Sequence, residues 1–465
     1  MNKSISFTSG PILSTLIKYT VPLIFTNLIQ VFYGIADSII VGMSGETEAV
    51  GAIGTTTAFI NLVVNMFIGC SIGTKVVVAR YVGERNSKKV ENAVHTSIAA
   101  SLLLSVICLT VVMPLTTPIL SAMGNRGKLL ELASTYAKLY FLSVPFTAIT
   151  NFSVAIIQAC GDTKTPLFIL GASGLLNVLL NLVFVTAFRM DVDGVALATI
   201  ISTLLSSVLL IRCLVKRKDD CRFSFKKLTL KASALKEILA VGMPAAIQNA
   251  LFSFSHMLVQ SSVLAVNNAI ASVESEFQPI VKGCAVCTSI ESIASTVVSS
   301  IGHAAVPFVA QNRGACNYER ILKGRRVWYC VSFVASSAIA LLLILLKDPL
   351  FYIYGITKSS PDPLVAIAYD AAYTRMLIMF IPYFLLGFME IGGAVLQGLG
   401  RSFTASVTSL VCSCLFRCVW LLTVFIAKPT LSVIFISFPI SWLITAVLHY
   451  VFAHAEIKGK RLNAN

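Results

Sequence analysis

Residues 19–28 read YTVPLIFTNL, and residues 241–251 read VGMPAAIQNAL. Both segments lie in long apolar runs, and in each an Asn follows a Pro at the same spacing. Two further pairs keep the same order in the two halves of the chain: ARYVGERN (79–86) with AQNRGACN (310–317), and AIIQACGDTKT (155–165) with AVLQGLGRSFT (394–404). Three ordered matches indicate an internal repeat, with one copy in each half.

The composition places this repeat in a membrane. Hydrophobic residues make up 56% of the chain and charged residues only 12%, whereas charged residues are about 25% of an ordinary soluble domain. A helix needs about 20 apolar residues to span a bilayer, and about twelve such stretches occur here. We expect them near residues 13–41, 50–78, 92–115, 131–158, 166–188, 194–215, 236–266, 283–309, 326–346, 371–397, 403–427 and 430–453. The alternating pattern of an outer-membrane barrel is missing, so the expected fold is all-α and integral to the membrane, with six transmembrane helices in each half.

Basic residues predict the orientation and the division of the chain. They collect in one set of alternate loops, most densely in KRKDDCRFSFKK (216–227). By the positive-inside rule, both termini are expected in the cytoplasm. The basic segment 213–235 is expected to link an N-lobe (1–212) to a C-lobe (236–465). The absence of a cleavable signal or organelle-targeting features favours a bacterial or archaeal plasma membrane. The formal charge of +15 is explained by this asymmetry and by attraction to anionic lipids, without nucleic acid.

One acid stands out in the first half. Asp37 lies in GIADSIIVG (34–42), and an ionised carboxylate in hydrocarbon costs several kcal/mol, so it is normally paired or used. Asn177 and Asn181 share a helix face, being four residues apart, and Thr199 is expected at a similar depth. One carboxylate with amide and hydroxyl oxygens suits Na⁺, and it equally suits a proton. The alternative is structural: Asp37 caps a helix end and the two Asn residues bridge helices.

Three ionisable residues fall inside spans of the second half: Glu291, Glu390 and Arg417. Carboxylates facing a cavity would attract cationic, lipophilic substrates, but Arg417 can also pair with either glutamate in a purely structural role. Aromatic and Met side chains would give an adaptable apolar wall, although packing or lipid contact explains them equally well. The wall candidates are Phe254, Met257 and Tyr383.

Two prolines and the cysteines need separate interpretation. Pro22 and Pro244 can kink their helices and serve as conformational elements, and a fixed kink is equally compatible with the sequence. Cys284-x-x-Cys287 and Cys412-x-Cys414-x-x-x-Cys418 lie inside apolar spans, and no four-ligand set with zinc-site spacing closes in a loop, so no metal site is expected. We expect the twelve cysteines to be mainly reduced.

AQNRGACNYER, QACGDTKTP, DGVALATIIS and LQGLG, together with the Pro22 segment, resemble the multidrug and toxic compound extrusion (MATE) family. The resemblance extends from about residue 20 to about residue 400. It implies a twelve-helix, V-shaped antiporter that expels organic compounds by using a Na⁺ or H⁺ gradient. It also implies a cation site around an acid in the first helix, which Asp37 matches. Many relatives have a second acid where this chain has Asn181, so the coupling ion stays open.

Other function classes fit less well. The chain has no Walker A loop, no GxSxG and no HExxH, and its loops are too short for a catalytic domain, so we expect no enzyme. The main alternative is a flippase of lipid-linked precursors, which would line its cavity with several basic residues. A channel is disfavoured because the repeat makes one pseudo-symmetric monomer without a Gly-rich filter. The expected partners are small organic substrates and membrane lipids, with no cofactor beyond the coupling ion.

Overall fold

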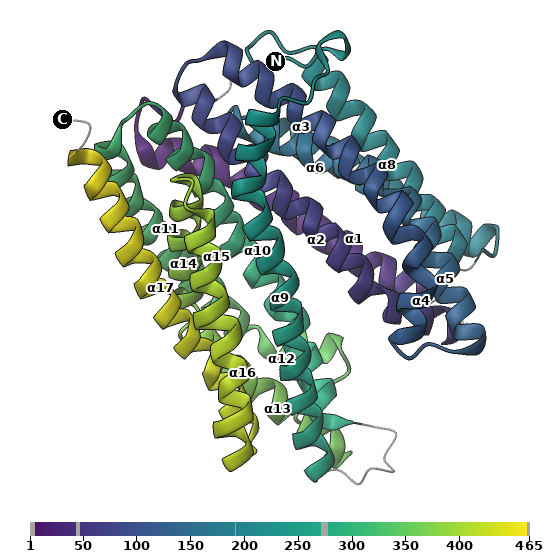
Figure 1. The fold of residues 1–465 in the computed structure, drawn as a ribbon. Helices are drawn as coiled ribbons and strands as arrows, with labels where there is room; N and C mark the ends of the chain where they lie inside the picture. The colour runs from purple at the N-terminus through teal and green to yellow at the C-terminus, as the bar shows by residue number, and fades with distance from the viewer. Residues whose placement is uncertain (1–4, 43–46, 191, 271–277, 463–465) are drawn as a thin grey trace. The chain divides into compact units, whose positions relative to one another are not determined.

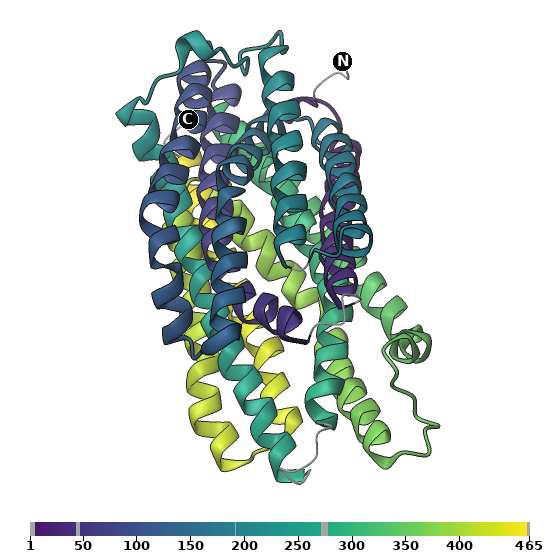
Figure 2. The same ribbon diagram turned by 90° about the vertical axis from the view of Figure 1, so that its right-hand side faces the viewer.

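The structure, a computed structural model, describes residues 5–42, 47–190, 192–270 and 278–462. It gives the backbone alone for residues 35, 37–42, 47–54, 57, 58, 192 and 270. Contacts divide the chain into two compact units. The N unit is Met1–Asn249 with Pro307–Asn317, and the C unit is Ala250–Val306 with Tyr318–Asn465. In each unit the long helices run side by side (Figure 1 and Figure 2).

Helices in the first half of the chain form most of the N unit. They are α1 (Ile12–Gly42), α2 (Thr47–Gly83), α3 (Ser87–Ile107), α4 (Met113–Ala122), α5 (Gly127–Leu142), α6 (Val144–Ala159), α7 (Lys164–Leu182) and α8 (Val192–Val215). The π-helical turns η1 (Cys108–Val112) and η2 (Val183–Ala187) extend α3 and α7, and the 3₁₀ turn η3 (Phe225–Lys227) lies in the basic segment.

Helices α9 (Ala232–Ile270) and α10 (Pro279–Gly314) belong to both units, because the unit boundaries fall inside them. The remaining elements lie in the C unit: α11 (Tyr318–Leu345), α12 (Lys347–Ile353), α13 (Pro363–Phe380), α14 (Phe384–Gly398), α15 (Ser402–Ser409), the π-helical turn η4 (Leu410–Leu415), α16 (Phe416–Trp420), the π-helical turn η5 (Leu421–Phe425) and α17 (Leu431–Leu462). The lobe boundary predicted at 213–235 follows the sequence repeat and stays a prediction.

The helices match the predicted membrane spans. In the described part of the chain, 11 helices are long and apolar enough to cross a membrane. The pair α5 and α6, bent by 45°, makes a twelfth span. The prediction of an all-helical membrane protein with twelve spans is confirmed. Its physical cause is that only helices satisfy their own backbone groups in hydrocarbon without a closed sheet.

The repeated motifs have the same backbone structure. At the end of α2, the amide of Asn86 donates to the carbonyl of Tyr81 at 3.3 Å, and Arg85 has a φ of 53°. At the end of α10, the amide of Asn317 donates to the carbonyl of Asn312 at 2.8 Å, and Cys316 has a φ of 54°. This is the helix-ending motif in which one left-handed residue lets two amides reach back to orphaned carbonyls.

A second repeated pair behaves in the same way. After α6, Gly161 has a φ of +84°, and the amide of Asp162 donates to Ile157. After α14, Gly400 has a φ of +70°, and the amide of Arg401 donates to Leu396. Glycine suits these positions because it adopts positive φ without steric cost. The internal repeat read from the sequence therefore corresponds to repeated structure.

The α2 and α10 turns also cross each other reciprocally. A Cβ on Gly83, the last residue of α2, would lie 2.0 Å from the carbonyl oxygen of Gln311. A Cβ on Gly314, the last residue of α10, would lie 2.0 Å from the carbonyl oxygen of Arg80. Gly83 and Gly314 are equivalent in the repeat, and so are Arg80 and Gln311. The crossing therefore has local two-fold symmetry, and both sides require glycine.

Small residues bring α9 against α2 as well. A Cβ on Gly69 would meet the Cα of Ala246 at 2.4 Å, and a Cβ on Gly73 would meet the carbonyl oxygen of Ile238 at 2.1 Å. A Cβ on Gly242 would in turn meet the Cα of Cys70 at 2.8 Å. Paired small residues four apart let two membrane helices approach closely. This contact explains why the first part of α9 belongs to the N unit.

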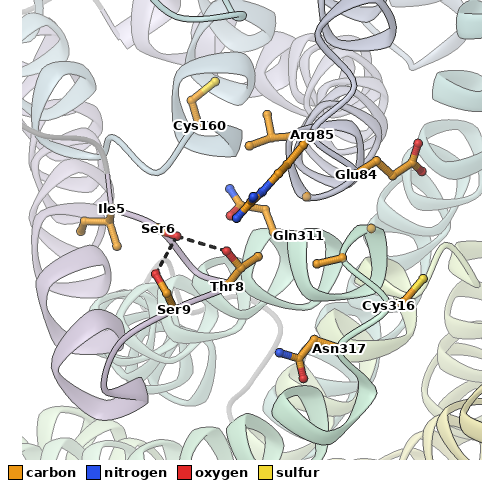
Figure 3. A pocket seen from close by; sticks show the side chains of 14 residues that line it. Ile5, Ser6, Thr8, Ser9, Glu84, Arg85, Cys160, Gln311, Cys316 and Asn317 are labelled. Carbon is orange, nitrogen blue, oxygen red and sulfur yellow. Dashed lines mark hydrogen bonds between the residues drawn. The ribbon is translucent and has the colours of Figure 1, made fainter.

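The N-terminal segment packs on the same ends of α2 and α10. Phe7 is fully buried, with its ring centroid 4.9 Å from that of Tyr19 and 6.1 Å from that of Phe308. The Asn312 side chain donates to the Phe7 carbonyl at 3.1 Å. Figure 3 shows the neighbouring polar cavity of about 730 Å³, where the Arg85 side chain extends toward Gln311.

One cysteine pair departs from the expected reduced state. Cys160, which follows α6, forms a disulfide with Cys221 in the basic segment. The other ten cysteines are free thiols. Sequence spacing alone does not reveal such a pairing, because connectivity cannot be read from cysteine positions.

The oxidised protein is expected to unfold with a free energy up to about 4 kcal/mol higher than the reduced protein. A cross-link over 61 residues restricts the unfolded chain. Thermal unfolding with and without reductant measures the difference. The double variant Cys160→Ser/Cys221→Ser should be indifferent to reductant; a reductant effect that persists in it would assign the difference to other thiols.

Candidate functional site

A chain of polar groups runs along the contact between α7 and α8 in the N unit. The Asn181 side-chain amide donates to the Asn177 Oδ1 at 3.4 Å, and the Asn177 amide donates to the Ser202 Oγ at 3.2 Å. The Ser202 hydroxyl donates to the Thr199 carbonyl at 3.1 Å. Asn181 is fully buried and Asn177 is 8% exposed. The structure therefore places Asn177, Asn181 and the Thr199 carbonyl in one hydrogen-bonded series, and their role in coupling stays a prediction.

Ser202 also belongs to this series of hydrogen-bonded side chains, and it was not predicted from the sequence. It lies three residues after Thr199 in GVALATIIS, so helical periodicity places both on one face. The Thr199 hydroxyl itself donates to the Val195 carbonyl of its own helix at 3.0 Å. Thr199 thus offers its carbonyl to the polar chain while Ser202 supplies the hydroxyl.

The Asp37 side chain lies outside the described residues, but its backbone belongs to α1. Two contacts fix the direction of α1 along α7. The Thr163 hydroxyl donates to the Tyr19 carbonyl at 3.0 Å, and the Tyr33 hydroxyl donates to the Gly171 carbonyl at 2.7 Å. The two helices therefore run parallel, and Asp37 follows Tyr33 by one turn.

In the C unit, Glu291 is neutralised by an arginine. The Arg375 guanidinium donates to the Glu291 Oε2 at 2.7 Å, and the two side chains are only 11% and 16% exposed. Arg375 also donates to the Cys284 carbonyl at 2.9 Å and lies over the Phe435 ring at 4.7 Å. The alternative in which Arg417 pairs with Glu291 is not observed: the ion-pair partner is Arg375, a basic residue inside a span that was not singled out from the sequence.

Arg417 lies elsewhere in the same unit, on α16. It is 3% exposed, its Nε donates to the Ser441 Oγ at 3.1 Å, and its guanidinium lies 4.0 Å from the centroid of the Phe438 ring. Within the described residues, no carboxylate forms an ion pair with Arg417. Its companions are therefore a hydroxyl and an aromatic face.

Glu390 lies on α14, half-buried against α10. Its Oε2 would be 3.4 Å from a Cβ on Gly302, so Glu390 packs closely against this glycine of α10. Among the residues that the structure describes, Glu390 has no ion-pair partner. The alternative in which Glu390 pairs with Arg417 is therefore not observed either. Glu390 and the exposed Asp370 on α13 are the acids of this unit's spans that have no ion-pair partner among the described residues.

The predicted apolar wall separates into two environments. Phe254 and Met257 lie on the exposed side of α9, where they are 58% and 62% exposed. Tyr383 is fully buried, and its ring packs edge to face with those of Phe380 and Trp442. Phe254 and Met257 can meet a ligand or lipid directly, whereas Tyr383 shapes the interior.

The two predicted kink positions lie inside continuous helices. Pro22 belongs to α1 and Pro244 to α9. The Thr26 hydroxyl donates to the Pro22 carbonyl at 2.8 Å, which supplies a local side-chain bond next to the missing proline amide. Pro244 lies between Gly242 and Ala246 at the close contact with α2.

The chain has relatives among known transport proteins. The MatE family model matches residues 22–183 and 244–423. The probable multidrug resistance protein YoeA of Bacillus subtilis is 24% identical over 400 residues, which are 84% of this chain and 82% of that protein. The probable multidrug resistance protein NorM of Thermotoga maritima is 27% identical over 347 residues, 73% of this chain and 71% of that protein.

A solved structure has the same fold. It is described as the outward-facing conformation of a multidrug resistance MATE family transporter of the MOP superfamily. The TM-score is 0.89, the sequence identity is 19%, and the superposition covers 99% of each chain.

Proposed function

Because this chain belongs to the multidrug and toxic compound extrusion family, we propose that it exports organic compounds across the plasma membrane by alternating access, in exchange for Na⁺ or H⁺. Multidrug efflux is the activity named for its relatives. The proposal also covers four more specific points: the coupling ion, the residues that bind it, the charge of the exported compound, and a cytoplasmic location for both termini.

The observation that carries the coupling site is the buried polar chain of α7 and α8. Asn181, Asn177 and Ser202 form successive hydrogen bonds in an otherwise apolar span, and buried polar groups in a membrane mark functional positions. Because α1 runs parallel to α7, the backbone of Asp37 lies farther along α7 than Tyr33 does, in the direction of these polar side chains. We assign Asp37 as the acid that holds Na⁺ or carries the proton, with Asn177, Asn181 and Thr199 as neutral oxygen donors.

For the exported compound, the candidate acid of the C unit is the half-buried Glu390, which has no ion-pair partner among the described residues. Glu291 already has Arg375 as its counter-charge, so it has little attraction left for a cationic ligand. Glu390 lies against Gly302 of α10. We assign Glu390 as the carboxylate that favours cationic, lipophilic substrates, with Phe254 and Met257 as adaptable apolar contacts.

Efflux of a permanently cationic dye from proteoliposomes tests this function. An imposed Na⁺ or H⁺ gradient should drive efflux in the wild type, and Asp37→Asn should abolish the driven component because the amide carries no charge to couple. The matched control is Asp193→Asn on α8, an exposed acid of the same unit. If Asp37→Asn retains driven efflux, the coupling assignment fails, and if the wild type moves no dye under either gradient, the antiport proposal fails.

A further inference from the structure

We propose that residues 225–231, FKKLTLK, lie in the headgroup region of the membrane and bind anionic lipids there. The net charge of the chain indicates attraction to anionic lipids in general, whereas the structure locates one segment that contacts them. The inference goes beyond the export function and does not depend on it. It is carried by exposed apolar side chains, by lysines without ion pairs and by the depth at which the fold holds the segment.

The segment exposes three large apolar side chains within six positions. Phe225 is 68% exposed, Leu228 39% and Leu230 47%. Residues 216–224, which precede them in the connection between α8 and α9, expose no large hydrophobic side chain. An exposed apolar group of this kind is unfavourable in water and marks an interaction site. In the outer part of a bilayer, the same side chains can contact the upper ends of the acyl chains.

The charges of the segment are all positive. Lys226, Lys227 and Lys231 are exposed, and the sequence has no acid between residues 225 and 231. Lys227 pairs with Glu91 at 2.6 Å. Within the described residues, Lys226 and Lys231 form no ion pair. Free ammonium groups that alternate with apolar side chains complement lipid phosphates without a neutralising amine, and therefore favour anionic over zwitterionic lipids.

The fold holds both ends of the segment on one turn of α3. Before the segment, the buried Phe223 has its ring centroid 5.2 Å from that of His95, and the Ser224 amide donates to the His95 Nε2 at 3.1 Å. At its end, the Lys231 amide donates to the Thr96 hydroxyl at 3.1 Å. Residues 225–230 therefore form a loop whose side chains are presented outward from α3.

This contact lies at the membrane surface. The apolar stretch of α3 is expected to begin near residue 92, and at 1.5 Å per residue Thr96 lies about 6 Å beyond that point. The membrane span of α9 begins at Ala232, directly after Lys231. The headgroup layers of a bilayer extend only several ångströms beyond its hydrocarbon core. Residues 225–231 are thus at headgroup depth, where their exposed side chains meet lipid.

Photocrosslinking in a bilayer tests the inference. The full-length protein with Phe225→p-benzoylphenylalanine is placed in nanodiscs that contain equal amounts of phosphatidylglycerol and phosphatidylcholine, and its adducts are identified by mass spectrometry. We expect lipid adducts at residue 225, with phosphatidylglycerol in at least fivefold excess, because each basic residue near an anionic surface is worth about that factor. Adding Lys226→Gln/Lys231→Gln to the same protein should bring the ratio of the two lipids close to one.

Two controls accompany this measurement. Lys216→Gln/Lys218→Gln removes the same charge from the same connection, at exposed positions without exposed apolar neighbours, and should keep most of the excess. Val334→p-benzoylphenylalanine, at a 64% exposed position within the α11 span, should give adducts of both lipids in equal amounts, because acyl chains carry no headgroup charge.

Three results would overturn the inference. The first is the absence of lipid adducts at residue 225 when residue 334 forms them, since the segment would then face water. The second is an adduct of residue 225 with a copurified protein in place of lipid. The third is an equal yield of the two lipids at residue 225, or an equal effect of the two lysine pairs. Gel filtration monitors folding, and if the Lys226→Gln/Lys231→Gln protein does not fold, Lys226→Gln alone gives the same comparison.

Discussion

Gly83→Ala is expected to abolish transport while the protein remains folded in the membrane. The added Cβ would lie 2.0 Å from the Gln311 carbonyl oxygen, and backbone cannot yield as a flexible side chain does. Overpacking of this kind costs about 1–3 kcal/mol. A penalty of about 2 kcal/mol on one conformation shifts a two-state equilibrium roughly thirtyfold. Under alternating access, the conformation with the crossed turns would seldom form.

Dye efflux, together with gel filtration to monitor folding, measures this effect. The reciprocal variant Gly314→Ala should give the same loss, because its Cβ meets the Arg80 carbonyl oxygen at the same distance. The double variant should lose no more than either single variant, since all three disrupt one contact. Gly171→Ala on α7 is the control, because a Cβ there meets no atom within 4 Å. Wild-type efflux by Gly83→Ala would show that the crossing is not needed for transport.

Breaking the buried ion pair of the C unit is expected to produce the largest loss of stability. Glu291→Gln or Arg375→Leu should lower the free energy of unfolding by about 3–5 kcal/mol, because each leaves one buried charge without its partner. The double variant Glu291→Met/Arg375→Leu should recover much of that loss, because it removes both charges. Unfolding by a denaturing detergent, followed by circular dichroism, gives the three values.

An exposed pair provides the comparison. Lys227 and Glu91 are 2.6 Å apart, but their side chains are 64% and 38% exposed. Lys227→Met should therefore change the free energy of unfolding by less than about 1 kcal/mol. If the double variant at Glu291 and Arg375 is as unstable as the single variants, the loss comes from altered packing and not from an unpaired charge.

The sequence predicts the helices because hydrophobicity and span length are local properties. It also predicts the family, because motifs such as AQNRGACNYER and QACGDTKTP resemble those of its members; the family model confirms that assignment. It predicts the common face of Asn177 and Asn181 from helical spacing alone. The coupling role of Asp37 stays a prediction.

The features that could not be predicted from the sequence depend on contacts between segments that are far apart in the chain. Arg375 and Glu291 are 84 positions apart, and nothing in a hydropathy pattern pairs them. The Cys160–Cys221 disulfide could not be predicted for the same reason, because its cysteines are 61 positions apart. Ser202 is different, since its spacing from Thr199 was visible and only its role in linking Asn177 was hidden.

The reciprocal crossing of α2 and α10 has an evolutionary consequence. In an isologous interface, each partner offers the same patch to the other, and Gly83 with Gly314 fits that description within one chain. A six-helix ancestor could form this contact only as a homodimer, before duplication and fusion made it intramolecular. Fusion frees the two copies to diverge, and the equivalent left-handed positions now hold Arg85 in one copy and Cys316 in the other.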